Sequence, residues 1–160
     1  MNSLVLFKNN LRLDDNPVLF HASENSSILP IYIYDNVNIE RDLGAASKYW
    51  LHNSLRSLNK SLDNRLVFLK GDTSKIVCYL IKSNNINKVF CEKPFQENDI
   101  KIFNNLKNTL SEINNVEFLF FNTTLLWEPS DILKNDNTPY KVFTPFYRKG
   151  CLTKTEPRPP

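Results

Sequence analysis

Glycine is scarce in this chain, with 3 glycines among 160 residues. Neither G-x-G-x-x-G nor G-x-x-x-x-G-K-[ST] occurs, which excludes a glycine-rich loop that cradles a pyrophosphate. The 3 cysteines are odd in number and lack C-x-x-C spacing, so we expect reduced thiols rather than a disulfide framework. His21 and His52 have no cysteine or carboxylate partners at metal-ligand spacing, so no metal site is expected.

Long apolar segments are also missing. No run of about 18 apolar residues is present, so we expect no membrane-spanning helix. The first residues show neither a charged region nor a small-residue cleavage site, so we expect no secretory signal. The net charge of +3 is too small to indicate nucleic-acid binding by itself. We therefore expect a cytoplasmic, monomeric protein that is large enough to bury one core.

Strand-like and helix-like segments alternate along the first 121 residues. The expected strands are Leu4–Lys8, Ile28–Tyr34, Arg65–Lys70, Lys88–Cys91 and Val116–Phe121. The expected helices are Pro17–Ser23, Ala45–Ser61, Thr73–Ser83 and about Asp99–Ile113. This alternation predicts an α/β fold with a mostly parallel sheet and right-handed crossovers. The pattern alone does not give the order of the strands.

The regular alternation ends after Phe121. Residues 122–160 contain six of the 9 prolines, which predicts a connector rather than a further part of the sheet. We therefore divide the chain into an α/β domain, 1–121, and a connector, 122–160.

The first strand leads to a helix through a polar loop that contains no glycine. Asn16 and Pro17 predict the N-cap and first position of that helix. The run resembles the opening W-F-R-x-D-L-R-L-x-D-N-x-A-L of the DNA photolyase/cryptochrome family, with Lys8 in place of its arginine and Asn10 in place of its aspartate. The matching residues are Phe7, Leu11, Arg12, Leu13, Asp15, Asn16 and Leu19.

A second resemblance lies in the connector. Tyr140–Phe146 reads Y-K-V-F-T-P-F, as in the segment that links the family's α/β domain to a helical domain. Trp50–Leu55 also resembles the family's W-L-x-x-S-L. The resemblance covers the whole chain and implies a Rossmann-like three-layer sandwich whose five parallel strands are ordered 3-2-1-4-5.

The resemblance also implies a function. The parent protein would be a deoxyribodipyrimidine photolyase, which splits cyclobutane pyrimidine dimers in damaged DNA when reduced FAD donates an electron in light. The FAD would lie in a helical C-terminal domain that we expect beyond this chain. The present domain would hold an antenna chromophore and pack against that helical domain. We name no catalytic residue here, and we predict that the chain alone cannot repair DNA.

The residues before the last helix are the first candidate site. Asn98 or Asp99 would cap that helix, and this is the simpler interpretation. A carboxylate with a neighbouring amide also suits the paired N–H donors of a pterin. Folate-binding members of the family hold methenyltetrahydrofolate with an Asn-Glu pair at this place, which corresponds here to Asn98 and Asp99.

The ends of the first two strands are the second candidate site. In other family members a deazaflavin or FMN occupies a slot there. The corresponding residues are Lys8, followed by Asn9 and Asn10, and the pair Tyr34 and Asp35. The choice between the chromophores stays open.

Two other functions stay open at this stage. A cryptochrome photoreceptor would share this domain, and a free-standing adenine-nucleotide module would share its fold, although the Tyr140–Phe146 segment argues against the module. The turn Lys70–Thr73 is interpreted as structural, with Asp72 as a helix N-cap. Trp50 and Trp127 are likewise interpreted as structural residues and not as electron carriers.

Overall fold

The structure is a computed structural model that describes residues 2–24, 27–38, 42–110 and 116–157. The chain divides into two compact units, Met1–Thr123 and Thr124–Pro160, which are described separately below. None of the helices within the described ranges is long and apolar enough to cross a membrane.

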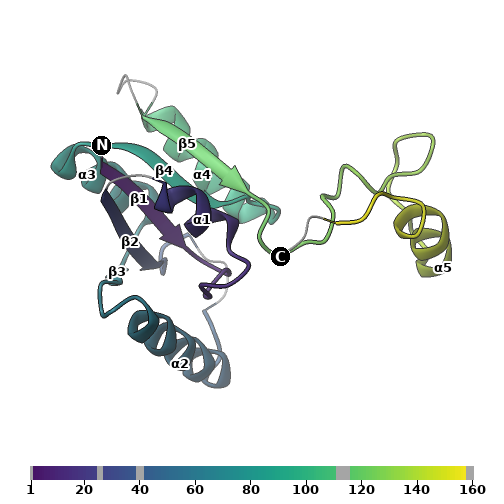
Figure 1. Cartoon of the computed structure of the whole chain (residues 1–160). Helices are drawn as coiled ribbons and strands as arrows, with labels where there is room; N and C mark the ends of the chain where they lie inside the picture. Colours follow the sequence, from purple (N-terminus) through teal and green to yellow (C-terminus); the bar gives the residue numbers. More distant parts are fainter. Residues whose placement is uncertain (1, 25–26, 39–41, 111–115, 158–160) are drawn as a thin grey trace. The chain divides into compact units, whose positions relative to one another are not determined.

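The first unit is built on a five-stranded sheet (Figure 1). All four strand pairings are parallel, and the order β3-β2-β1-β4-β5 confirms the predicted topology. The strands are β1 (Asn2–Phe7), β2 (Ser27–Tyr34), β3 (Val67–Lys70), β4 (Ile86–Glu92) and β5 (Glu117–Phe121). The order reverses between β1 and β4, which is where open α/β sheets bind ligands at their carboxyl edge.

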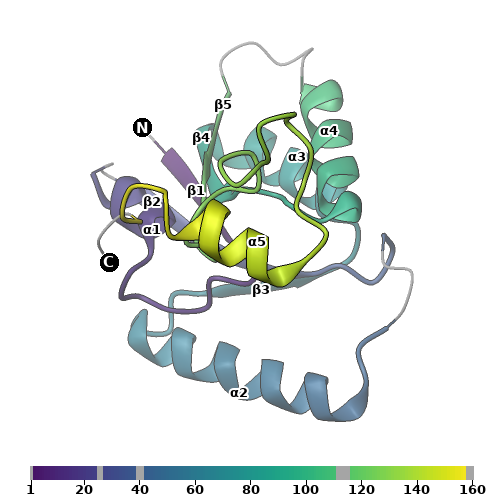
Figure 2. The same ribbon diagram turned by 90° about the vertical axis from the view of Figure 1, so that its right-hand side faces the viewer.

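Helices cover both faces of the sheet (Figure 2). Leu4 and Leu6 pack with residues of α3 (Thr73–Asn84) and α4 (Glu97–Leu110) on one face. Val5 and Phe7 pack with residues of α1 (Pro17–Ser23) and α2 (Ala45–Ser61) on the other. Successive side chains of a strand point to opposite faces, so an apolar run such as Leu4 to Phe7 belongs in a central strand covered on both sides.

Two helix starts follow the predicted capping chemistry. The Asn16 side chain accepts a hydrogen bond from the Leu19 N–H at 3.3 Å, and Pro17 is the first residue of α1. The Asp72 side chain accepts from the Lys75 N–H at 3.0 Å at the start of α3. A capped helix start needs only neighbouring residues, which is why local sequence identifies it.

Other local predictions need correction. Helix α4 begins at Glu97, and the Gln96 carbonyl accepts its first intrahelical bond from the Ile100 N–H. Asn98 and Asp99 therefore lie inside the first turn and do not cap the helix. The predicted end of this helix, Ile113, lies outside the described residues. Trp50 lies on α2, the helix predicted for it, and is 76% exposed.

The second unit contains helical structure that the proline-rich sequence did not predict. A short helix, α5 (Phe143–Pro145), continues into a π-helical segment, η1 (Phe146–Cys151). Gly150 packs closely there, since a methyl group at its Cα would lie 2.8 Å from Ile132 Cγ2. The Trp127 indole donates to the Thr155 carbonyl at 3.0 Å, which supports its structural interpretation.

Candidate ligand-binding cleft

A cleft of about 560 Å³ opens at the carboxyl ends of β1 and β2. Its volume lies within the range of about 300–1,000 Å³ that is typical of small-molecule sites. The structure brings all five predicted site residues to this one cleft: Lys8, Tyr34, Asp35, Asn98 and Asp99. The inner wall is mainly apolar and includes Leu6, Phe7, Leu11, Ile33, Leu43, Leu51, Ile102 and Phe103. Such a wall suits a flat, mostly apolar ring with a few polar contacts at its edge.

An ion pair spans the cleft floor between β1 and α4. The Lys8 ammonium donates to Asp99 Oδ1 and so links the end of β1 to the first turn of α4. The Asp99 side chain is nearly buried, at 11% exposure, whereas that of Lys8 is 42% exposed. A buried carboxylate is costly unless it is paired, and Lys8 provides that partner for Asp99. A ligand at Asp99 would have to share this carboxylate with Lys8.

The Asp35 carboxylate accepts four hydrogen bonds within the protein, three from backbone N–H groups and one from a side-chain amide. Its Oδ1 accepts from the N–H groups of Val37 and Asn38, both at 2.9 Å. Its Oδ2 accepts from Asn38 Nδ2 at 2.9 Å and from the Thr73 N–H at 3.0 Å. Partial burial raises the pKa of Asp35, but these hydrogen bonds outweigh it and hold the pKa well below its ordinary value. A carboxylate accepts about four such bonds, so Asp35 shapes the cleft by joining the end of β2 to α3.

Tyr34 stands at the mouth of the cleft. Its hydroxyl donates to Asp42 Oδ1, while Lys48 donates to Asp42 Oδ2. These bonds, first from Lys48 and then from Tyr34, lower the pKa of Asp42 to about 2. The same hydrogen bond to Asp42 raises the pKa of Tyr34, so the phenol stays protonated. Tyr34 is thus held as a neutral aromatic wall.

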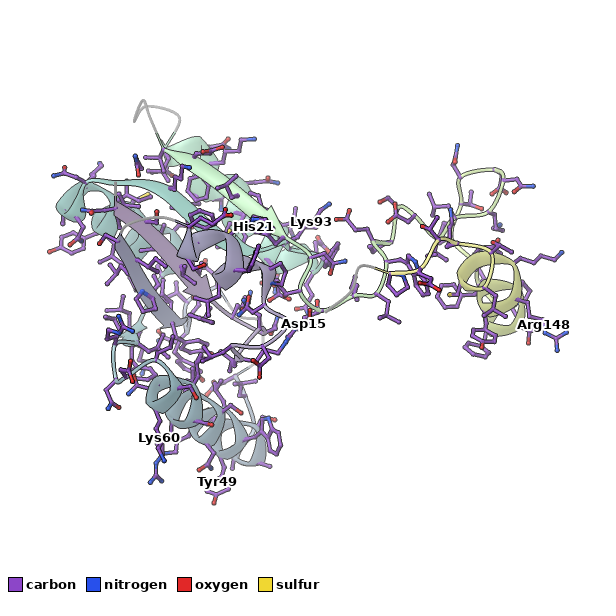
Figure 3. All side chains as sticks on the ribbon, viewed as in Figure 1. Asp15, His21, Tyr49, Lys60, Lys93 and Arg148 are labelled. Carbon is purple, nitrogen blue, oxygen red and sulfur yellow. The ribbon has the colours of Figure 1, made fainter. Side chains whose placement is uncertain are left out.

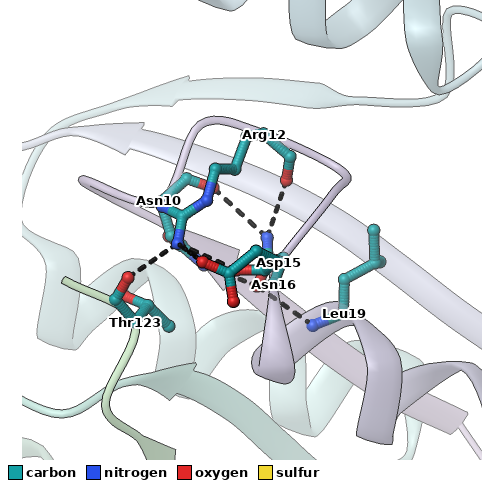
Figure 4. A network of polar contacts seen from close by, with 6 residues as sticks. All are labelled: Asn10, Arg12, Asp15, Asn16, Leu19 and Thr123. Carbon is teal, nitrogen blue, oxygen red and sulfur yellow. Dashed lines mark hydrogen bonds and ion pairs between the residues drawn. The ribbon is translucent and has the colours of Figure 1, made fainter. Parts of the chain in front are cut away.

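The loop from β1 to α1 is fixed by a network of polar contacts (Figure 4). Buried Asn10 and Asn16 bond to each other, and Asn16 Nδ2 also donates to the Arg12 carbonyl at 2.8 Å. Arg12 donates to the carbonyls of Asp15 and Thr123, at 2.8 Å and 2.7 Å. Arg12, Asp15 and Asn16 therefore shape the loop, and Arg12 also ties it to the segment after β5.

Sequence reasoning missed Glu92. This residue ends β4 and is buried, and its Oε2 accepts from the Asn9 N–H at 3.2 Å. Glu92 thereby fixes the residue after Lys8 at the point where the strand order reverses. A carboxylate directly after the apolar run Val89–Cys91 was an available signal, because ligand sites gather at strand carboxyl ends.

The histidines do not build a site. His21, labelled in Figure 3, lies on α1. Its ring stacks on that of Phe121 with centroids 4.7 Å apart, and His52 is exposed on α2. Within the described ranges, no group of three or more His, Cys, Asp or Glu side chains is arranged to hold a metal ion.

A parallel five-stranded sheet with helices on both faces and a largely apolar cleft at its carboxyl edge defines a Rossmann-like α/β domain. The sequence narrows this class to one family. The chain belongs to the DNA photolyase family, whose sequence model matches residues 3–160. This membership argues against a free-standing adenine-nucleotide module.

Individual relatives agree with this assignment. The chain is 33% identical over 149 residues to the deoxyribodipyrimidine photo-lyase of Agrobacterium fabrum, with 91% of this chain and 30% of that protein covered. A class III photolyase structure from Agrobacterium tumefaciens matches 98% of this chain and 32% of its own, with a TM-score of 0.86 and 32% identity. A Synechocystis sp. PCC6803 cryptochrome matches with the same TM-score of 0.86 at 22% identity, over 99% of this chain and 35% of its own. This chain therefore spans about a third of the length of these relatives.

Proposed function

We propose that this chain is the antenna-chromophore domain of a light-driven deoxyribodipyrimidine photolyase. Its identity to a bacterial photolyase, 33%, supports repair of cyclobutane pyrimidine dimers as the activity of the whole protein. In that proposal FAD and damaged DNA are bound by a helical C-terminal domain, and this domain packs against it. A cryptochrome shares the fold equally well but at 22% identity, so we take photoreception as the second candidate.

The observation that carries the antenna proposal is the cleft at the carboxyl edge. An apolar slot lined by Ile33, Leu51 and Phe103 suits the faces of a planar ring, and Asn98 and Gln96 offer amides at its edge. A chromophore bound there would supply absorption of near-UV or blue light. The chain's own residues would position that ring and exclude water from its faces.

The proposed choice of chromophore follows from the ion pair between Asp99 and Lys8. Because Lys8 already donates to Asp99 Oδ1, a pterin that paired with both carboxylate oxygens would have to share Oδ1 with the ammonium. Asn98 lines the same cleft, and its side-chain amide offers one acceptor oxygen and one donor nitrogen. We therefore propose that the slot near Lys8 and Tyr34 favours a flavin or deazaflavin ring over methenyltetrahydrofolate.

A binding experiment tests the antenna proposal. The purified chain is titrated with FMN, a deazaflavin and methenyltetrahydrofolate, and binding is followed by absorbance and fluorescence anisotropy. We expect Leu51→Trp to fill the slot and abolish binding. Asn104→Ala, an exposed position on α4, is the matched surface control and should bind as the wild type does. Absence of binding by all three compounds would reject the antenna function.

A further inference from the structure

A second, polar pocket adjoins the cleft, and the two share Tyr34. This outer pocket measures about 570 Å³ and is lined by Tyr34, Asn36, Asp42, Lys48 and Lys70, which are all polar or charged. Neighbouring residues line different pockets. Asp35 lines the inner cleft and Asn36 the outer pocket, and likewise Ser47 lines the inner cleft and Lys48 the outer pocket. The two pockets are therefore compartments of one site, with Tyr34 between them.

The outer compartment carries a net positive charge. Asp42 is neutralised by Lys48, and its oxygens also accept from the Tyr34 hydroxyl and the Leu43 N–H. Lys70, at the end of β3, adds a second ammonium, and no carboxylate among the described residues forms an ion pair with it. An ammonium in a polar pocket attracts an anionic group, and a phosphate or carboxylate is its usual partner.

We propose that the outer compartment binds the anionic tail of the ligand whose ring occupies the inner cleft, with Lys70 as the main recognition residue and Lys48 as its neighbour. This inference rests on the proposed antenna function. The shared chemistry is one anionic group joined to a planar ring by a short polar chain. A flavin phosphate and a folate glutamate carboxylate are two sources of such a group.

Riboflavin and FMN test the proposal because they share one ring and differ by one phosphate. We expect FMN to bind about tenfold more tightly than riboflavin, as befits one charge-assisted contact at a partly exposed site. Lys70→Gln should remove most of that ratio, and Lys70→Arg should retain it. Lys60→Gln makes the same charge change on α2, about 18 Å along the helix from Lys48, and should leave the ratio unchanged.

Each outcome separates the two proposals. If FMN and riboflavin bind equally well, the anionic-tail site is wrong while the antenna cleft stands. If methenyltetrahydrofolate binds and its affinity falls in Lys70→Gln, the tail is a carboxylate and the site is correct. If no compound binds, both proposals are wrong. Because Lys70 is exposed, its variants should keep the fold, which far-UV circular dichroism checks.

Discussion

Replacement of Asp35 by alanine should destabilise the first unit by about 2 kcal/mol. The variant removes an acceptor of four hydrogen bonds of 2.9–3.0 Å. Val37 is exposed, so its N–H regains a partner in water. Thr73 is 8% exposed, so its N–H is left without a partner at the start of α3. An unsatisfied buried donor costs about 1–3 kcal/mol, and the half-exposed bonds add less.

Asp35→Asn gives a finer test of the same reasoning. One amide oxygen can replace Oδ1, but the amide nitrogen then faces the Thr73 N–H and cannot accept from it. We expect a loss of about 1 kcal/mol, between those of the wild type and the alanine variant. Urea denaturation followed by far-UV circular dichroism measures both values. Asp14→Asn makes the same charge change in the exposed β1–α1 loop and should be neutral.

The pH dependence of the stability tests whether the charge of the Asp35 carboxylate matters. The pKa of Asp35 is lower in the folded state than in the unfolded chain, where it is about 3.9. Its carboxylate therefore stabilises the fold above about pH 4, and this contribution is lost as the pH falls through the lower, folded-state value. The stability difference between wild type and Asp35→Asn should narrow below about pH 4. A difference that stays constant down to about pH 2 would show that the carboxylate charge plays no part in fixing the cleft wall.

Three further predictions concern Asn16, Gly71 and Lys8, and each is measured by urea denaturation. Asn16→Ala should lower the free energy of unfolding by about 2 kcal/mol. Asn16→Asp should restore only the helix cap, because a carboxylate cannot donate to the Arg12 carbonyl. Gly71→Ala should cost about 1–3 kcal/mol, since its φ of +137° is strained for any residue with a Cβ; an unchanged midpoint would contradict this. Lys8→Met should cost about 2 kcal/mol by leaving nearly buried Asp99 unpaired, and Lys8→Met combined with Asp99→Leu should recover most of it.

The elements that sequence predicted best are those whose cause is local. The N-caps Asn16 and Asp72 act within three residues, and the apolar run Leu4 to Phe7 needs only two covered faces. Strand order depends on which distant strands pair, and no local pattern encodes that. It came from the family resemblance. The sequence did not predict the helical segment around Phe146, where the rings of Tyr140 and Phe146 pack edge to face with centroids 6.3 Å apart.

The sequence predicted which residues lie at the candidate site but not which hydrogen bonds they form there. Strand-end positions named Lys8, Tyr34 and Asp35 because parallel strands present their carboxyl ends at one edge. Nothing in the sequence showed that the Asp35 carboxylate accepts from backbone donors. Two of those donors are the N–H groups of Val37 and Asn38, and the third is the N–H of Thr73, 38 residues later. The sequence can place a polar side chain at the carboxyl edge of the sheet, but the tertiary structure decides which groups form hydrogen bonds with it.

Two departures from the family pattern meet in this cleft. Lys8 stands where the family has arginine, and Asp99 stands where the folate-binding members have glutamate, and the two side chains form one ion pair. The lysine ammonium is a compact charge, whereas the arginine guanidinium is planar and can bind both oxygens of a carboxylate. Lys8 accordingly bonds to one oxygen of Asp99. Asp99 also lies in the first turn of α4, where the helix dipole favours negative charge. The two positions therefore meet in one ion pair at the cleft, and this ion pair is the basis of the proposed preference against a pterin.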